Sequence, residues 1–309
     1  MEKKKQRKRS KGDIGFDIFV AIVMIIMVLI CIYPFYLAVI MSFNEGLDAQ
    51  RGGIYLLPRI FTLENYAKLF RDGQWGQAFA VTLARTVLGT FMTVFFTLIV
   101  SYGLSFQELV FRKVYYSIFI FAMYFSGGVI PYYILLRTLH LLNTFWVYVV
   151  PGCLSLFYLI VAVSFFQDIP KELRESARLD GAGEFTIFRK IILPICKPLM
   201  ATISIFTAVG HWNSWYESAF FIPNNKGLRT VGYLMISVIN SSRASGNAAD
   251  AAMQAAAKTT TLSIQLAAMV VAVVPILCIY PFFQRYFVTG MTVGAVKGAQ
   301  GLTSKALGL

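Results

Sequence analysis

The side chains of this chain that could bind a ligand are few, and one short segment holds most of them. Residues 211–217 read HWNSWYE and contain one of only two histidines. Aromatic faces combined with hydrogen-bonding groups are the side chains that hold a sugar, so the segment is a candidate for lining a path for such a molecule. The alternative is that it packs against neighbouring helices or forms an interfacial aromatic belt. The candidate path residues are His211, Ser214, Trp215, Trp212, Tyr216 and, from an earlier segment, Arg85.

No other residue pattern points to catalysis or to a metal site. The four cysteines are far apart and form no CxxC pair, which argues against both a zinc site and a disulfide framework. The phosphate-binding pattern GxxxxGK[ST] is absent, and the glycine-rich stretch GMTVGAVKGAQG does not fit it. An enzyme would need convergent acids, histidines or metal ligands, whereas the apolar segments hold one histidine and one glutamate. We therefore expect that the chain binds no metal and no cofactor.

The composition places these residues in a lipid bilayer. Of 309 residues, 57% are hydrophobic and 14% are charged, with a mean hydropathy of +0.65, whereas a soluble domain carries roughly a quarter charged residues. The net charge of +13 does not indicate a nucleic-acid-binding stripe, because seven of the 28 Lys and Arg residues lie in the first eleven positions, ahead of a long apolar run. This is the placement of a cytoplasmic anchor.

Six segments are apolar and long enough, or nearly so, to cross a bilayer, which takes about twenty residues of helix. They are Ile18–Met41, Ala78–Phe106, Val114–Leu136, Leu141–Phe166, Leu199–Phe221 and Leu262–Phe287. The first is too long for the apolar part of a signal peptide, so we expect it to be retained. Residues 125–131, FSGGVIP, predict a kink in the third. The expected fold class is an all-α membrane protein with six transmembrane helices.

The basic residues set the orientation of these helices. If the N-terminus lies inside, eighteen Lys and Arg residues fall in inner segments and nine in outer loops, so both termini are expected in the cytoplasm. The expected organisation is a basic tail (1–15), a first transmembrane helix (16–43), an external loop (44–77), a five-helix core (78–287) that includes a cytoplasmic loop (168–198), and a cytoplasmic C-terminal tail (288–309).

Charged and polar side chains inside the expected helices need partners or a cavity. Arg85 either snorkels to the outer surface or faces an anionic sugar or a partner acid. We expect one face of the fifth helix to line the path, and the opposite face, with Asn213 and Glu217, to bond to a neighbouring helix. The path-lining face consists of His211, Ser214, Trp215 and Ser218, flanked by Trp212 and Tyr216.

The loop 168–198 is far longer than the two to eight residues that a helix connection needs, and its sequence predicts two short helices. Asp168 is placed to cap the first, Lys171–Leu179, and Asp180-Gly181 to end it, because glycine adopts the left-handed conformation of a C-terminal cap. The second, Glu184–Ile192, would place four apolar side chains on one side: Phe185, Phe188, Ile191 and Ile192. The result is a two-helix knob that could dock a partner; a plain loop of solvated charges is the alternative.

The spacing within this loop resembles the EAA loop of bacterial ABC import permeases. The segment ESARLDGAGEFTIFRKIILP, residues 175–194, matches the pattern E-A-A, three residues, G, nine residues, I-x-L-P, with Ser176 where the family usually has alanine. The stretches IPKELRESARLDGAGEFTIFRKIILPICKP, VGHWNSWYESAFF and YPFFQRYFVTGMTVGAVKG look like carbohydrate-uptake type I permeases. Within these, the chain most resembles the second, maltose-type subunit of oligosaccharide importers, especially the aldouronate branch, over about residues 78–298.

The resemblance implies a type I importer permease fold and a division of labour among subunits. A second homologous permease would complete the path, two ATP-binding subunits would use ATP and Mg, and an extracellular or periplasmic binding protein would deliver the sugar. The loop would insert into a cleft of an ATP-binding subunit, where Glu175 would meet a basic residue. The coupling residues so implied are Glu175, Ser176, Ala177, Asp180, Gly181, Ala182, Leu193 and Pro194. The chain would then be a non-enzymatic permease of the inner or plasma membrane; a permease for peptides or amino acids and a stand-alone secondary transporter are the alternatives.

Overall fold

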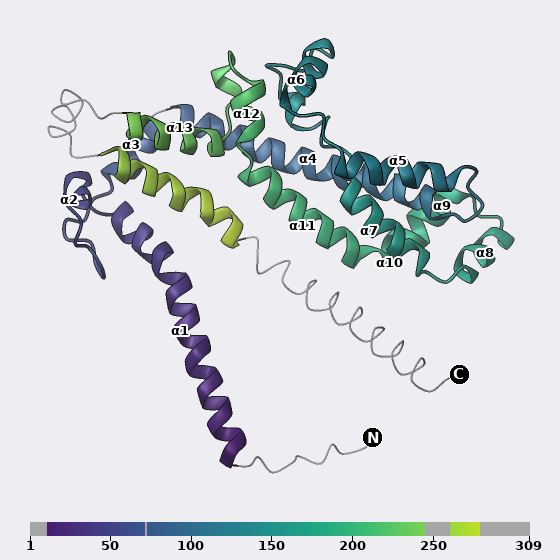
Figure 1. Cartoon of the computed structure of the whole chain (residues 1–309), viewed down its shortest axis with the longest axis horizontal. Coiled ribbons are helices and arrows are strands. Elements are labelled where there is room, and N and C mark those ends of the chain that lie inside the picture. The colour runs from purple at the N-terminus through teal and green to yellow at the C-terminus, as the bar shows by residue number, and fades with distance from the viewer. Residues whose placement is uncertain (1–10, 72, 245–259, 279–309) are drawn as a thin grey trace. The chain divides into compact units, whose positions relative to one another are not determined.

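The chain folds into helices joined by turns and loops. The computed structural model describes residues 11–71, 73–244 and 260–278, and the strand-like pairing within these ranges is a single bridge between Asn44 and Phe61. The all-α fold class is therefore confirmed. The chain divides into two compact units: unit 1, residues 1–71 with 238–271, and unit 2, residues 72–237 with 272–309 (Figure 1). The predicted tail 288–309 and most of the predicted tail 1–15 lie outside the described residues.

Unit 1 is built on one long apolar helix, α1 (Lys11–Ser42). An 18-residue window of its stretch Gly15–Ser42 has a mean hydropathy of 3.0, and the stretch is exposed over most of its length, as expected of a helix surrounded by lipid. Pro34 lies inside it, which a membrane helix tolerates. The span predicted at Ile18–Met41 is therefore one helix, long enough to cross a bilayer.

The segment after α1, predicted as an external loop, is folded. It contains two short helices, α2 (Gly46–Gln50) and α3 (Glu64–Arg71), and the next helix begins at Gly73, four residues before the predicted end of the loop. The Thr260 hydroxyl, next to the last described helix, donates to the Gly46 carbonyl at 3.2 Å. Unit 1 therefore joins segments more than two hundred residues apart.

A buried polar network holds the folded segment together. The Asn65 amide donates to the backbone carbonyls of Ser42 and Asn44, at 2.9 Å each. Asp48 accepts hydrogen bonds from Asn44 at 2.9 Å and from Arg59 at 3.0 Å. The hydrogen bond from Asn44, followed by that from Arg59, holds the pKa of Asp48 below its ordinary value. These bonds make the segment a defined structure rather than a tether.

Unit 2 is organised around α4 (Gly73–Ser105), a second helix long enough to span a membrane. Two more helices, α7 (Leu156–Gln167) and α11 (Lys197–Asn213), pack along it. Their shared core includes Val94, Leu98, Tyr102, Ala162, Phe166, Leu199 and Ile203. Figure 1 shows the segment 172–195 gathered at the C-terminal end of α4.

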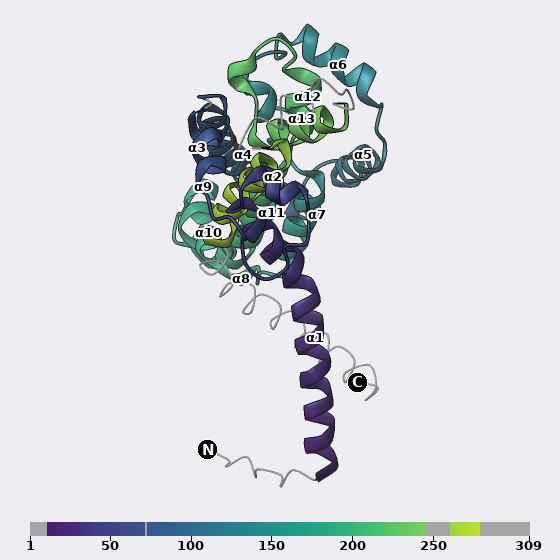
Figure 2. The same cartoon turned by 90° about the vertical axis from the view of Figure 1, so that its left-hand side faces the viewer.

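The third predicted span is interrupted at the predicted kink. Val114–Leu136 divides into α5 (Arg112–Tyr124) and α6 (Val129–Thr138), which are bent by 115° relative to each other. Figure 2 shows the two helices pointing in different directions. Gly128, at the break, has a φ of 85°, a left-handed value that glycine adopts without strain.

The fourth predicted span, Leu141–Phe166, is wrong as one continuous helix. Its first half holds a short 3₁₀ turn, η1 (Phe145–Tyr148), and a turn around Pro151. Proline cannot donate a backbone hydrogen bond, so a regular helix resumes only at α7, where Ser155 provides a side-chain cap.

The fifth predicted span, Leu199–Phe221, breaks near its end. α11 stops at Asn213, and a separate helix, α12 (Tyr216–Phe221), follows. Among the described residues, three helices are long enough to cross a bilayer, or five if each of two bent pairs counts as one span. The third of these helices, Thr261–Cys278, begins one residue before the predicted sixth span and covers its described part.

Candidate functional site

The first helix of the loop 168–198 is α8 (Glu172–Leu179), and it ends as its sequence predicts. Gly181 takes a φ of 80°, and its N–H bonds to the Arg178 carbonyl at 3.0 Å. The Ala182 N–H bonds to the Ala177 carbonyl at 2.9 Å. Together the two bonds make a Schellman cap, so the glycine is required by the left-handed turn.

The predicted N-cap of α8 is wrong, although the helix begins one residue after the predicted Lys171. α7 continues to Gln167, which leaves Asp168 in a helical conformation at the end of that helix. An N-cap side chain needs an extended backbone, which Asp168 does not have. Lys171 occupies the N-cap position instead and makes no side-chain capping bond.

The second helix of the loop is irregular. It consists of α9 (Glu184–Ile187), a π-turn, η2 (Phe188–Ile192), and α10 (Leu193–Ile195). Residues five apart align in a π-turn, so Ile187 shares the buried side with Ile192. Phe185, which the regular helical period places on that side, is 72% exposed, so its predicted position is wrong.

A buried apolar face fixes the loop to the bundle. The loop residues in the shared core are Ala177, Ile187, Phe188 and Ile192. They pack with Tyr102 near the end of α4 and with Phe166 near the end of α7. A displacement of the loop must therefore move these two helices, because buried side chains have no free volume in which to slip.

Glu184 adds a polar clamp to this attachment. Its carboxylate accepts from the Tyr102 hydroxyl at 3.1 Å, from Arg174 at 3.2 Å and from Arg178 at 2.6 Å. Partial burial opposes the charge on Glu184, but the bonds from Arg174, Arg178 and Tyr102 hold its pKa below the ordinary value. The Arg174 guanidinium also lies 3.7 Å from the centroid of the Phe106 ring.

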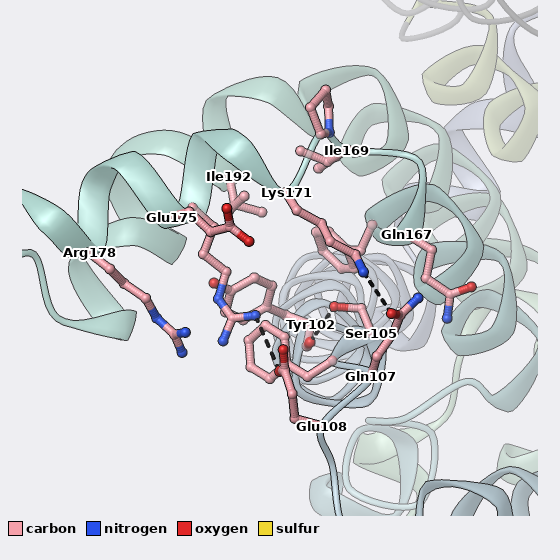
Figure 3. Close-up of a pocket in the computed structure, with 14 residues that line it drawn as sticks. Tyr102, Ser105, Gln107, Glu108, Gln167, Ile169, Lys171, Glu175, Arg178 and Ile192 are labelled. Atoms are coloured by element: carbon pink, nitrogen blue, oxygen red, sulfur yellow. Dashed lines mark hydrogen bonds and ion pairs between the residues drawn. The ribbon is translucent and has the colours of Figure 1, made fainter.

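A small cavity of about 100 Å³ lies between α8 and the end of α4 (Figure 3). Beside it, the Lys171 ammonium donates to the Gln107 side chain at 2.6 Å. The cavity is too small for an oligosaccharide, since ligand pockets enclose roughly 300–1,000 Å³. The exposed carboxylate of Glu175 has no ion-pair partner among the described residues. It is therefore available to a residue from outside this chain.

The outer side of the loop exposes large apolar side chains. Leu179 is 90% exposed, and Leu173 and Phe185 are also exposed. Exposed apolar groups on an otherwise rigid, charged loop are typical of a protein contact surface. The loop thus has one apolar side packed on the bundle and a second one that is uncovered within the described part of the chain.

A larger cavity, of about 360 Å³, is lined by α4, α11 and the segment before α7, with single residues from α6, α7 and α12. Arg85 lies in its wall and is 2% exposed, so the predicted snorkelling to the surface is wrong. Its guanidinium forms an ion pair with Glu217 at 2.9 Å, donates to the Ser214 carbonyl at 3.2 Å and lies 4.7 Å from the centroid of the Tyr148 ring. The partner acid therefore comes from this chain.

The break between α11 and α12 changes the predicted faces. A continuous helix would place Glu217 opposite His211, yet both line the same cavity. The two helices are separated by Ser214 and Trp215, so helical periodicity does not carry across. Glu217 bonds to a neighbouring helix as expected, through Arg85 of α4, but the expectation that it faces away from the cavity is wrong.

Close packing fixes the position of His211. A Cβ atom built on Gly89 of α4 would lie 2.5 Å from the His211 Nε2 atom, which is far inside van der Waals contact. Only glycine leaves room for the imidazole at this point. α4 and α11 therefore approach each other closely beside the cavity.

The other predicted path residues do not line this cavity in the described structure. Trp212 donates from Nε1 to the Ala272 carbonyl at 2.9 Å, and Tyr216 packs against Phe221. Ser214 bonds to the Glu217 carboxylate at 2.5 Å. Trp215 is 38% exposed. Of the six candidates, the structure brings Arg85 and His211 together in the wall.

Sequence reasoning missed two kinds of cavity residue. Glu217 lies in the segment that was singled out, and a carboxylate within a membrane bundle is itself a signal that a cation is near. Tyr148 and Thr93 gave no comparable signal, because a tyrosine or threonine among apolar residues is common in membrane helices.

Comparison with known sequences places the chain among transport proteins. The family model described as "Binding-protein-dependent transport system inner membrane component" matches residues 109–293. The chain is 33% identical to the polygalacturonan/rhamnogalacturonan transport system permease protein YtcP of Bacillus subtilis (strain 168). The match covers 92% of this chain and 98% of that protein.

Comparison with solved structures agrees with the sequence comparison. A chain from a bacterial ABC transporter involved in the import of the acidic polysaccharide alginate superposes with a TM-score of 0.81 and 26% identity, over 91% of this chain and 100% of that chain. A chain from a bacterial alginate ABC transporter in complex with an alginate pentasaccharide-bound periplasmic protein gives a TM-score of 0.51 and 15% identity, over 89% and 96% of the two chains. The second likeness shows the fold alone.

Proposed function

Since the chain belongs to the family of binding-protein-dependent transport system inner membrane components, we propose that the loop 168–198 transmits ATP-driven motion to a path for an oligosaccharide. The chain is a membrane-spanning permease of a sugar ABC importer, and it is not an enzyme. ATP hydrolysis belongs to separate subunits. We propose which subunit the loop docks on and which residues contact the sugar.

The single observation that carries the coupling role is the construction of the loop. Its inner side is packed into the core of α4 and α7 and clamped through Glu184, whereas its outer side exposes Glu175, Leu179 and Phe185. A rigid element that is packed firmly on the bundle and exposed on its outer side can transmit a displacement from a partner to the helices. We assign this docking to an ATP-binding subunit, which would hold the ATP and Mg.

The larger cavity is the proposed part of the sugar path in this subunit. At about 360 Å³ it falls in the range of ligand pockets, and its wall combines aromatic rings with the polar side chains of Arg85, His211 and Glu217. The relatives support a sugar cargo, because they are named for polygalacturonan/rhamnogalacturonan transport and for the import of alginate. A peptide or amino acid cargo has no comparable support among them.

The remaining partners follow from the same proposal. Half a path in one subunit requires a second homologous permease, and a lipid-anchored or periplasmic sugar-binding protein would deliver the cargo. Both termini are proposed in the cytoplasm of a cell whose inner or plasma membrane the helices cross, because the loop 168–198 must face the ATP-binding subunits. A stand-alone secondary transporter is disfavoured, since it would need no docking loop.

The docking surface can be tested with Leu179→Asp in the complete transporter. Leu179 is 90% exposed, so the change does not disturb the fold of this chain. We expect the ATP-binding subunits to be lost on purification and sugar uptake to fall to background. Val110→Asp is the matched control, because Val110 is 68% exposed and lies outside the loop; it should leave both unchanged. Full uptake and a full complement of ATP-binding subunits in Leu179→Asp would refute the docking role.

A further inference from the structure

The segment between α2 and α3 carries an exposed apolar tip. Tyr55, Leu56 and Leu57 are consecutive and are 65%, 71% and 74% exposed. Their neighbours Ile60 and Phe61 are exposed as well. A run of large apolar side chains facing water is rare on a protein surface and marks a contact with another apolar phase.

The tip does not project freely but runs alongside α1. Ile54, directly before it, is 4% exposed and packs with Ile40 of the helix. Two residues later, the Tyr36 hydroxyl donates to the Leu56 carbonyl at 2.6 Å. Between these two contacts the segment descends along the helix by about one turn, from the level of Ile40 to that of Tyr36.

The base of the segment is held in place by polar bonds. Arg59 bonds to Asp48 at 3.0 Å and to the Gly52 carbonyl at 2.6 Å. The Ile60 N–H donates to the Asn44 side chain at 2.8 Å. Because the base is fixed, the tip cannot fold back to bury its leucines. The same bonds hold the tip beside α1.

The level of Tyr36 can be placed relative to the bilayer. The hydrocarbon core accommodates about twenty helical residues, and the apolar run of α1 has 24, residues 18–41. If this run is centred on the hydrocarbon core, the outer boundary of the core falls near Val39 and Ile40. Tyr36 then lies roughly 5 Å inside that boundary, at a rise of 1.5 Å per residue. The tip of the segment therefore reaches the level where headgroups meet acyl chains.

We propose that residues 55–57 are inserted into the lipid interface beside α1, as a built-in membrane anchor. The side chains of Leu56 and Leu57 enter the upper acyl region at the level of Tyr36, and Tyr55, nearer the fixed base, lies closer to the headgroups, where tyrosine is enriched. Irregular backbone cannot enter hydrocarbon unsatisfied; here the Leu56 carbonyl is satisfied by Tyr36. The occupant is lipid rather than protein, because the tip continues the exposed apolar surface of α1 at the same level, including Phe35 and Val39.

The insertion can be tested by placing a diazirine amino acid at Leu57 in the complete transporter, reconstituted into vesicles of phosphatidylethanolamine and phosphatidylglycerol. The reactive carbene inserts into whatever touches the side chain, and mass spectrometry identifies the product. Phe35, 61% exposed on α1, is the lipid reference, and Ala67, exposed on α3, is the aqueous reference.

We expect the lipid-adduct fraction at Leu57 to match that at Phe35 and to exceed that at Ala67 several-fold. A product dominated by water addition, as at Ala67, would overturn the proposal. A cross-link to another protein subunit would overturn it too, because the tip would then be a protein contact. The same probe at Leu56 guards against a local effect of the label, since both side chains are exposed and an apolar replacement leaves the fold intact.

Discussion

The ion pair between Arg85 and Glu217 allows a quantitative test of the cavity. The guanidinium is 2% exposed and the carboxylate 30% exposed, with 2.9 Å between Nη2 and Oε2. Coulomb's law gives about 6 kcal/mol for this separation at an effective dielectric constant of 20, and about 1.4 kcal/mol in water. Removing one partner of a buried pair costs about 3–5 kcal/mol. We expect about 3 kcal/mol for Glu217→Gln, because one partner is partly solvated.

The opposite change should be milder. Arg85→Met leaves a carboxylate that is partly exposed and still bonded to Ser214 at 2.5 Å, so we expect a loss of about 1–2 kcal/mol. The double variant contains no uncompensated buried charge and should lose no more than Arg85→Met alone. The interaction energy between the two sites is then close to 3 kcal/mol, at the upper end for residues in contact.

The assay is thermal unfolding of the purified transporter in one detergent. A loss of about 3 kcal/mol corresponds to roughly 5 °C in Tm for a chain of 309 residues, at about 2.1 cal/mol/K of unfolding entropy per residue, so Glu217→Gln should unfold below the double variant. Arg137→Met is the control, because Arg137 is exposed, and it should change the stability by less than about 0.5 kcal/mol. If the losses from Arg85→Met and Glu217→Gln simply add in the double variant, the two charges do not interact, and the argument is refuted.

Two further predictions concern the cavity wall and the loop. Gly89→Ala should displace the His211 imidazole and lower sugar uptake while the complex still assembles, whereas Gly103→Ala on the same helix, where an added Cβ meets nothing within 4 Å, should leave uptake unchanged; equal uptake in both variants would contradict a role for His211. The lowered pKa of Glu184 implies a stabilising contribution that is complete above the unfolded value of 4.5 and is lost as the pH falls through the lower folded pKa. Melting temperatures measured from pH 7 downward should fall less steeply in Glu184→Gln, and parallel curves would show that the clamp does not contribute.

The parts of the structure that local sequence determines could be predicted. Gly181 could be placed because one residue type suits a left-handed turn after a helix, and the predicted conformation is confirmed. The kink before α6 follows in the same way from a short run of glycines and a proline. The long apolar runs of α1 and α4 identify themselves by length and composition.

The parts that depend on distant residues could not be predicted. Arg85 and Glu217 are 132 positions apart, and the sequence around either residue does not indicate that the other is its partner. The break after Asn213 has no proline or glycine to announce it, so a regular helical period assigned Glu217 to the wrong side. The π-turn after Ile187 similarly moves the buried side of the loop away from Phe185.

The close approach at Gly89 limits how the bundle can move. The imidazole of His211 occupies a notch in α4 at Gly89, and Arg85 and Thr93 stand one turn before and one turn after that notch. A slide of α11 by one turn, 5.4 Å, would drive the ring into one of these side chains. The notch therefore opposes sliding of the two helices along each other. We therefore expect α4 and α11 to move together along their axes, so that the cavity opens through the other elements around it.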